Sequence, residues 1–240
     1  MIESKPEVRL ASRPQNAWTD LGLTLPVFLV YHLGVVALPV QNAADLLTRT
    51  LTELAERSLM TYWLLTLSIG AAFVTVLLVL GRGQSLRWQR FVAIAGESIL
   101  YAVVLRVVAS AVVGRLHLDV GLGSLRDTFP GLVMALGAGF YEELVFRVGL
   151  FALGGRLVWL AFVASPLPWK RFFFWVGWAA FTSALFSAWH HVGTLGEPFS
   201  LGVFVFRWSC GLLFTLIFAF RGFAPVVWTH MMYDIWVLVL

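Results

Sequence analysis

Residues 128–155 read TFPGLVMALGAGFYEELVFRVGLFALGG, a long apolar run that carries charges near its centre. The run exceeds the roughly 20 apolar residues that a helix needs to cross a bilayer. Its charged side chains are Glu142, Glu143 and Arg147. Each charge at the centre of a membrane helix costs about 2.5–3.5 kcal/mol on insertion scales. Three of them together therefore indicate either a functional site or a paired structural core.

The composition of the whole chain is typical of a membrane protein. Of its 240 residues, 60% are hydrophobic and 12% are charged, against about 45–50% and about 25% in an ordinary soluble domain. The pattern lacks the alternation of lipid-facing strands, so we predict an all-α polytopic bundle. It forms one membrane domain over residues 1–240, with about seven transmembrane helices, or eight as the alternative. The predicted helices cover residues 18–40, 58–80, 91–113, 128–153, 172–192, 201–219 and 222–240.

The distribution of basic residues predicts the orientation. With seven spans, one side of the membrane receives Lys5, Arg9, Arg13, Arg82, Arg87, Arg90, Arg156, Lys170, Arg171 and Arg221. The positive-inside rule makes that side cytoplasmic. We therefore expect an integral protein of a bacterial inner (plasma) membrane with a cytoplasmic N-terminus. The piece LVWLAFVASPLPW, residues 157–169, is too short to cross and is predicted to be an interfacial segment.

The net charge of +4 is explained by this orientation. No basic stripe with interleaved aromatic residues is present, so nucleic acid is not an expected partner. The expected partners are membrane lipids and a membrane-anchored or lipidated peptide or protein substrate. The sequence does not specify an oligomeric state.

The charges of the 128–153 helix divide between two directions. Glu143 and Arg147 are four residues apart, so they share a helical face and can pair. Glu142 is rotated from Glu143 by about 100° and points elsewhere. One carboxylate is therefore expected to be held in an ion pair while the other remains available.

Two later helices carry polar side chains at the same spacing. Phe186 and His190 share a face of the 172–192 helix, and His230 and Asp234 share a face of the last helix. If the three helices converge, a carboxylate and two imidazoles lie together in a partly dry cavity. Such a set can activate water by general-base catalysis and stabilise an oxyanion.

These motifs resemble those of the CPBP family of intramembrane proteases, which includes the CAAX prenyl endopeptidases and the bacterial Abi-type immunity proteins. The family pattern is EExxxR, then FxxxH, then HxxxN or HxxxD, each on its own apolar helix. Here the motifs read Glu142-Glu143-Leu-Val-Phe-Arg147, Phe186-Ser-Ala-Trp-His190 and His230-Met-Met-Tyr-Asp234, all within residues 128–240.

The resemblance implies hydrolysis of a peptide bond inside the membrane without a covalent enzyme intermediate. Glu142 would activate water with the help of His190. The pair formed by Glu143 and Arg147 would organise the site. His230 and Asp234 would steady the oxyanion. The substrate of a bacterial member need not be prenylated.

The family has also been called metalloproteases, which would make Glu142, His190 and His230 zinc ligands. We predict no cofactor and no metal. The chain has no HExxH helix, and the helical spacings do not by themselves present three ligands on one face.

Asp234 departs from the family pattern, since this position is often Asn. An ionised carboxylate cannot donate a hydrogen bond to an oxyanion. Asp234 is therefore expected either to be protonated or to orient His230.

Other interpretations remain open on the sequence alone. The Glu143–Arg147 and His230–Asp234 pairs could be purely structural. Buried acids and histidines also form proton relays in transporters, although no inverted repeat is visible. A catalytically silent immunity or scaffold protein is a third possibility. His32 and His117 lie near predicted helix ends and are expected to face water.

Overall fold

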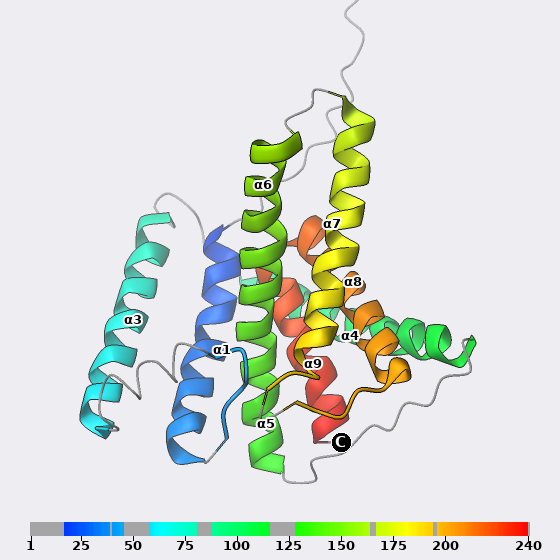
Figure 1. Ribbon diagram of the computed structural model, residues 1–240. Coiled ribbons are helices and arrows are strands. Elements are labelled where there is room, and N and C mark those ends of the chain that lie inside the picture. Colours follow the sequence, from blue (N-terminus) through cyan, green and yellow to red (C-terminus); the bar gives the residue numbers. More distant parts are fainter. Residues whose placement is uncertain are drawn as a thin grey trace, which may run out of the picture.

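The computed structural model describes residues 17–38, 40–45, 58–80, 88–115, 128–163, 167–193 and 196–239. These residues form helices joined by loops (Figure 1), and the predicted all-α membrane bundle is confirmed. The helices are α1 (Ala17–Ala37), α3 (Leu59–Leu80), α4 (Trp88–Arg115), α7 (Pro168–Trp189), α8 (Leu201–Arg221) and α9 (Phe223–Leu238), with one long helix between α4 and α7.

That long helix runs continuously from Thr128 to Val163. It comprises α5 (Thr128–Gly137), η1 (Ala138–Glu142), η2 (Leu144–Gly154), α6 (Gly155–Val158) and η3 (Trp159–Val163). The η segments have the wider winding of a π-helix, a feature that is frequent at functional sites.

The prediction that this helix ends near residue 153 was wrong, because the helix continues to Val163. The interfacial placement of residues 157–169 stays a prediction. Gly155 has helical dihedral angles of φ −60° and ψ −38°. A Cβ at Gly155 would lie 2.6 Å from the Trp175 ring of α7. This glycine therefore permits close packing of two helices rather than ending one.

Among the residues that the structure describes, four helices are long and apolar enough to cross a membrane: α4, the helix over Thr128–Val163, α7 and α8. Shorter apolar stretches lie in α1, over Gly22–Val35, and in α3, over Leu59–Thr75. Apolar side chains on the outside of these helices, such as Leu67, Val107 and Phe173, are more than half exposed. This exposure is expected where lipid is the solvent.

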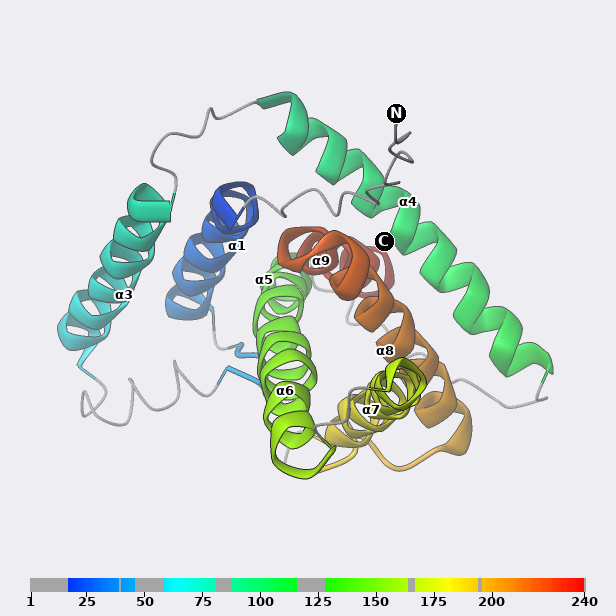
Figure 2. The same cartoon turned by 90° about the horizontal axis from the view of Figure 1, so that it is seen from above.

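Helix α9 lies at the centre of the bundle. It packs against α4, α5, η1, α8 and α1, while α7 packs against α8 and η2. Figure 2 shows α4 passing across the outside of α8 and α9, and α3 lying outermost beside α1. A Cβ at Gly139 would lie 2.8 Å from the carbonyl oxygen of Val227, so this glycine brings η1 close to α9.

Two apolar cores meet at α9. One joins α4, α8, α9 and the long helix through residues such as Leu105, Phe146 and Phe214. The other joins α1, α5, η1 and α9 through residues such as Phe28 and Phe140. Close packing on both sides fixes α9, and the polar residues of α9 and η1 lie between the two cores.

The expectation that His32 faces water was wrong. Its side chain is buried in α1, with Nδ1 2.7 Å from the hydroxyl of Tyr62 and Nε2 2.6 Å from the hydroxyl of Tyr141. These hydrogen bonds join α1 to α3 and η1, because a buried imidazole requires polar partners. His117 lies outside the described residues.

Two charges of α4 have structural partners. Glu97 accepts hydrogen bonds from Arg221 at the end of α8, at 2.6 and 2.5 Å. Arg106 lies over the ring of Trp236, 4.9 Å from its centroid. These contacts hold α4 to α8 and α9.

Candidate active site

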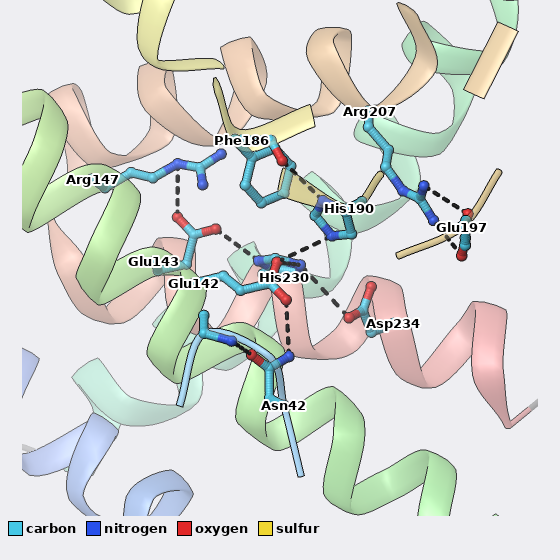
Figure 3. Close-up of polar contacts among 11 residues, drawn as sticks. Asn42, Glu142, Glu143, Arg147, Phe186, His190, Glu197, Arg207, His230 and Asp234 are labelled. Carbon is cyan, nitrogen blue, oxygen red and sulfur yellow. Dashed lines mark hydrogen bonds and ion pairs between the residues drawn. The ribbon is translucent and has the colours of Figure 1, made fainter. Parts of the chain in front are cut away.

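The adjacent side chains of Glu142 and Glu143 point in different directions, as their spacing predicts. Figure 3 shows Glu142 facing His190, and Glu143 lying between Arg147 and His230. Both are buried, with 5% and 0% of their surface exposed. A buried carboxylate requires charged or hydrogen-bonding partners, and each of the two carboxylates has its own set of partners.

Glu143 is held by a cation on its own helix. Its Oε2 lies 3.0 Å from Nε of Arg147. Arg147 also donates a hydrogen bond from Nη2 to the carbonyl oxygen of Gly211 at 3.2 Å. The guanidinium lies over the rings of Phe186 and Phe214, 4.4 and 5.2 Å from their centroids. These contacts tie η2 to α7 and α8.

His230 is oriented by Glu143 from across the bundle. Its Nδ1 donates a hydrogen bond to Glu143 Oε1 at 2.7 Å, and its ring stacks on Phe214 at 4.4 Å. Its Nε2 therefore points to the other side, where it lies 3.9 Å from Glu142 Oε2 and 3.6 Å from Asp234 Oδ2.

His190 follows the last residue of α7. Its Nδ1 donates a hydrogen bond to the carbonyl oxygen of Phe186 at 2.9 Å. In the neutral imidazole this bond leaves Nε2 as an acceptor. Nε2 lies 3.5 Å from Glu142 Oε2, so two acceptor atoms face one another at a distance that a water molecule can bridge with its two protons.

These side chains line a cavity of about 750 Å³. One wall is polar and contains Glu142, His190, His230 and Asp234. The other walls are mostly apolar and are built by Val203, Phe206, Cys210, Phe214, Val237, Leu238 and Met134, among others. A largely apolar pocket with a few convergent polar groups is the common form of a ligand site.

The structure thus brings all six predicted side chains to one place between η1, η2, α7 and α9. The expected convergence of three polar helices is seen. The chemical role of each residue stays a prediction.

Sequence reasoning missed Asn42. This residue lies in the loop Val40–Asp45 after α1, and its Nδ2 donates a hydrogen bond to Glu142 Oε1 at 2.9 Å. It is 4% exposed. In the sequence it lies within a polar linker, and nothing in the spacing distinguished it from a solvated loop residue.

Sequence reasoning also missed Arg207 of α8 and Glu197 of the loop before it. Arg207 donates two hydrogen bonds to the Glu197 carboxylate, at 2.8 and 2.9 Å. These bonds lower the pKa of Glu197 below its usual value. Both residues line the cavity, so the loop that carries Glu197 forms part of its wall.

The metal alternative depends on the positions of the donor atoms. Among the described residues, no group of three or more His, Cys, Asp or Glu side chains is arranged to hold a metal ion. Glu142, His190 and His230 lie close together, yet they do not form such a group. The prediction of a site without metal stays a prediction.

Residues 124–236 match the model of a family described as type II CAAX prenyl endopeptidase Rce1-like. This segment contains all six predicted site residues, but Asn42 lies outside it. No curated protein and no solved structure gave a significant match to the chain.

Proposed function

Since residues 124–236 match the model of the Rce1-like family of CAAX prenyl endopeptidases, we propose that the protein hydrolyses a peptide bond with water activated by Glu142 and His190. The family and the apolar helices make it an intramembrane endopeptidase in general terms. The observation that carries the proposed mechanism is the 3.5 Å separation of Glu142 Oε2 and His190 Nε2 on the wall of the cavity.

A water molecule between these acceptors donates one proton to each and keeps a lone pair free for attack. Its oxygen forms a bond to the carbonyl carbon of the substrate while Glu142 takes the proton. The carbonyl π electrons move to the oxygen and produce a tetrahedral oxyanion. General-base catalysis of this kind contributes about 10²–10⁴-fold.

His230 lies where it can donate to that oxyanion. With Nδ1 bonded to Glu143, its Nε2 donates only when the ring is an imidazolium. Three carboxylates surround the ring, Glu142 at 3.9 Å, Glu143 at 2.7 Å and Asp234 at 3.6 Å, and Arg147 neutralises one of them. An imidazolium held among these carboxylates is suited to stabilising an oxyanion.

Collapse of the tetrahedral intermediate completes the reaction. The oxyanion electrons reform the C=O bond, the C–N bond breaks, and Glu142 returns its proton to the leaving nitrogen. The products are a carboxylic acid and an amine, and the enzyme regains its starting state. We propose that no metal takes part.

The proposed substrate is a membrane-anchored or lipidated peptide. Its apolar side chains would occupy the wall formed by Val203, Phe206 and Phe214, where burial stabilises each by about 1.5–3 kcal/mol. The proposed substrate need not be prenylated.

The experiment is cleavage of a panel of membrane-anchored fluorogenic peptides by the purified protein in liposomes. The wild type should cleave at least one peptide, while Glu142→Gln and His190→Gln should fall to background with unchanged thermal stability. His191→Gln is the matched control, because His191 is next in sequence but contacts the carbonyl oxygen of Glu197 instead of Glu142. Cleavage by Glu142→Gln at the wild-type rate would exclude this mechanism. Proton transport without cleavage would favour a transporter.

We also propose a cytoplasmic N-terminus in a bacterial inner membrane, from the positive-inside rule. Cys210 is the only cysteine of the chain, so Cys210→Ser provides a background for single-cysteine labelling. An impermeant maleimide applied to spheroplasts should label Gly123→Cys and not Gly83→Cys. The reverse pattern would invert the proposed topology.

A further inference from the structure

We infer that Asn42 is a positioning residue for Glu142, and that the loop Val40–Asp45 completes the active site from outside the family-matched segment. The role in catalysis rests on the proposed function, whereas the contact with Glu142 does not. Asn42 and Glu142 are joined by a 2.9 Å hydrogen bond across 100 residues of sequence.

The orientation of the Asn42 amide is fixed by its second contact. Its Oδ1 accepts a hydrogen bond from the backbone N–H of Ala44 at 2.8 Å. Because an N–H group can bond only to an acceptor, this contact identifies the oxygen end of the amide. The Nδ2 end must therefore face Glu142, to which it donates.

The loop itself is anchored to α1. The backbone N–H of Asn42 donates to the hydroxyl of Tyr31 at 3.1 Å, and that hydroxyl donates to Asp45 Oδ2 at 2.9 Å. Gln41 donates from Nε2 to the carbonyl oxygen of Asp45 at 3.1 Å. Tyr31 and Asp45 are 0% and 1% exposed, so the loop is a packed part of the structure.

The bond from Asn42 distinguishes the two oxygens of Glu142. Oε1 is occupied by the amide, which resists rotation of the carboxylate. Oε2 is buried, has no hydrogen-bond partner among the described residues, and faces Nε2 of His190 and of His230. Oε2 is therefore the atom left to accept a proton from water.

A neutral amide is suited to this task. It orients the carboxylate by donating a hydrogen bond, yet it does not act as an acid and carries no full charge. Lysine or arginine in its place would form an ion pair and weaken the carboxylate as a base. The cation of the site, Arg147, is instead directed to Glu143.

A role confined to the turn is the alternative that the test must separate. Asn42 bonds Ala44 N–H as a turn residue does. Asp and Ser can both keep that bond through a side-chain oxygen, but neither retains the amide donor. Asp also places a second carboxylate beside Glu142.

The first measurement is thermal unfolding in detergent of the wild type, Asn42→Asp, Glu142→Gln and the double variant. Asn42→Asp should lower the unfolding temperature by several degrees, because two carboxylates then meet at hydrogen-bond distance. In the double variant most of this loss should disappear, because the amide introduced at position 142 can donate to the carboxylate introduced at position 42. Additive effects would overturn the inferred contact.

The second measurement is turnover of a cleaved peptide. Asn42→Ser should lower kcat by about tenfold to a hundredfold with KM nearly unchanged, and Asn42→Asp should be less active than Asn42→Ser. A role confined to the turn predicts that Asp, the closer match to Asn in shape, retains more activity than Ser. Ser68→Ala is the control, since its hydroxyl bonds only within α3 among the described contacts.

The outcomes separate the two proposals. Coupled stability without any proteolysis would refute the proposed function and leave the Asn42–Glu142 contact established. Proteolysis that requires Glu142, together with additive stability and wild-type kcat in both Asn42 variants, would refute the positioning role alone.

Discussion

Glu143 and His230 are joined by a 2.7 Å hydrogen bond between two helices, and both side chains are buried. Glu143 receives the cation Arg147 on its other oxygen, 3.0 Å away. One carboxylate therefore links the ion pair of the long helix to the imidazole of α9. The stability of the pair and the orientation of the imidazole depend on one another.

Arg147→Met should lower the free energy of unfolding by about 3–5 kcal/mol, because it leaves a buried carboxylate without its cation. Thermal unfolding in detergent measures this change. Glu143→Gln with Arg147→Met should recover a large part of the stability, since both charges are gone. A single variant as stable as the wild type would contradict the buried pair.

Metal analysis gives a second prediction. Purified active protein should contain far less than one zinc per chain, and its activity should survive strong chelators. Elemental analysis and peptide cleavage measure the two quantities on one sample. Stoichiometric metal, with activity lost on chelation and restored by zinc, would recast Glu142, His190 and His230 as ligands.

The carboxylate of Asp234 gives a third prediction. Asp234→Asn should retain activity, because the amide can donate and accept at the same place. Asp234→Ala should lower kcat by about a hundredfold, because it removes the group beside Nε2 of His230, and about a hundredfold is the scale for the loss of one oxyanion donor. The comparison requires protein of matched thermal stability. If Asn were as inactive as Ala, the negative charge beside His230 would itself be required.

Gly139→Ala should destabilise the bundle by about 1–3 kcal/mol, because the new methyl group would lie 2.8 Å from the backbone oxygen of Val227. Unfolding in detergent measures the loss. Gly177→Ala is the matched control, since a Cβ there meets nothing within 4 Å and Ala favours helix over Gly. Equal effects of the two substitutions would argue against close packing of η1 on α9.

The Glu197–Arg207 pair should respond to acid. Because Arg207 lowers the pKa of Glu197, the pair contributes stability above the usual glutamate pKa of about 4.3. This contribution is lost as the pH falls through the lower folded value. Unfolding of the wild type and Glu197→Gln should therefore differ at neutral pH and converge in acid. A difference that grows in acid would contradict the pairing.

The helices and the predicted site could be read from the sequence because both depend on local spacing. Helical periodicity predicts the helix face on which each of Glu142, Glu143 and Arg147 lies. The three motifs limit how α7 and α9 can lie. Asn42 could not be found in this way. Its contact with Glu142 depends on how the loop after α1 folds back, which is a tertiary property without a periodic signal.

The predictions that were wrong failed for the same reason, because they too depended on tertiary contacts. The helix was predicted to end near residue 153, although Trp175 and Trp178 of α7 pack against the space that Gly155 leaves. His32 was assigned to water because it lies near a predicted helix end. Its partners, Tyr62 and Tyr141, come from segments that only the folded bundle brings together.

The continuous helix from Thr128 to Val163 creates a hydrophobic mismatch. Its 36 residues span about 54 Å at a rise of 1.5 Å per residue, whereas a core about 30 Å thick accommodates about 39 Å of helix even at a tilt of 40°. About 15 Å must therefore extend into the headgroup region. Beyond Arg156 the helix exposes Leu157, Leu160 and Phe162. A change in bilayer thickness thus acts on the end of a helix that continues without a break to the turn carrying Glu142.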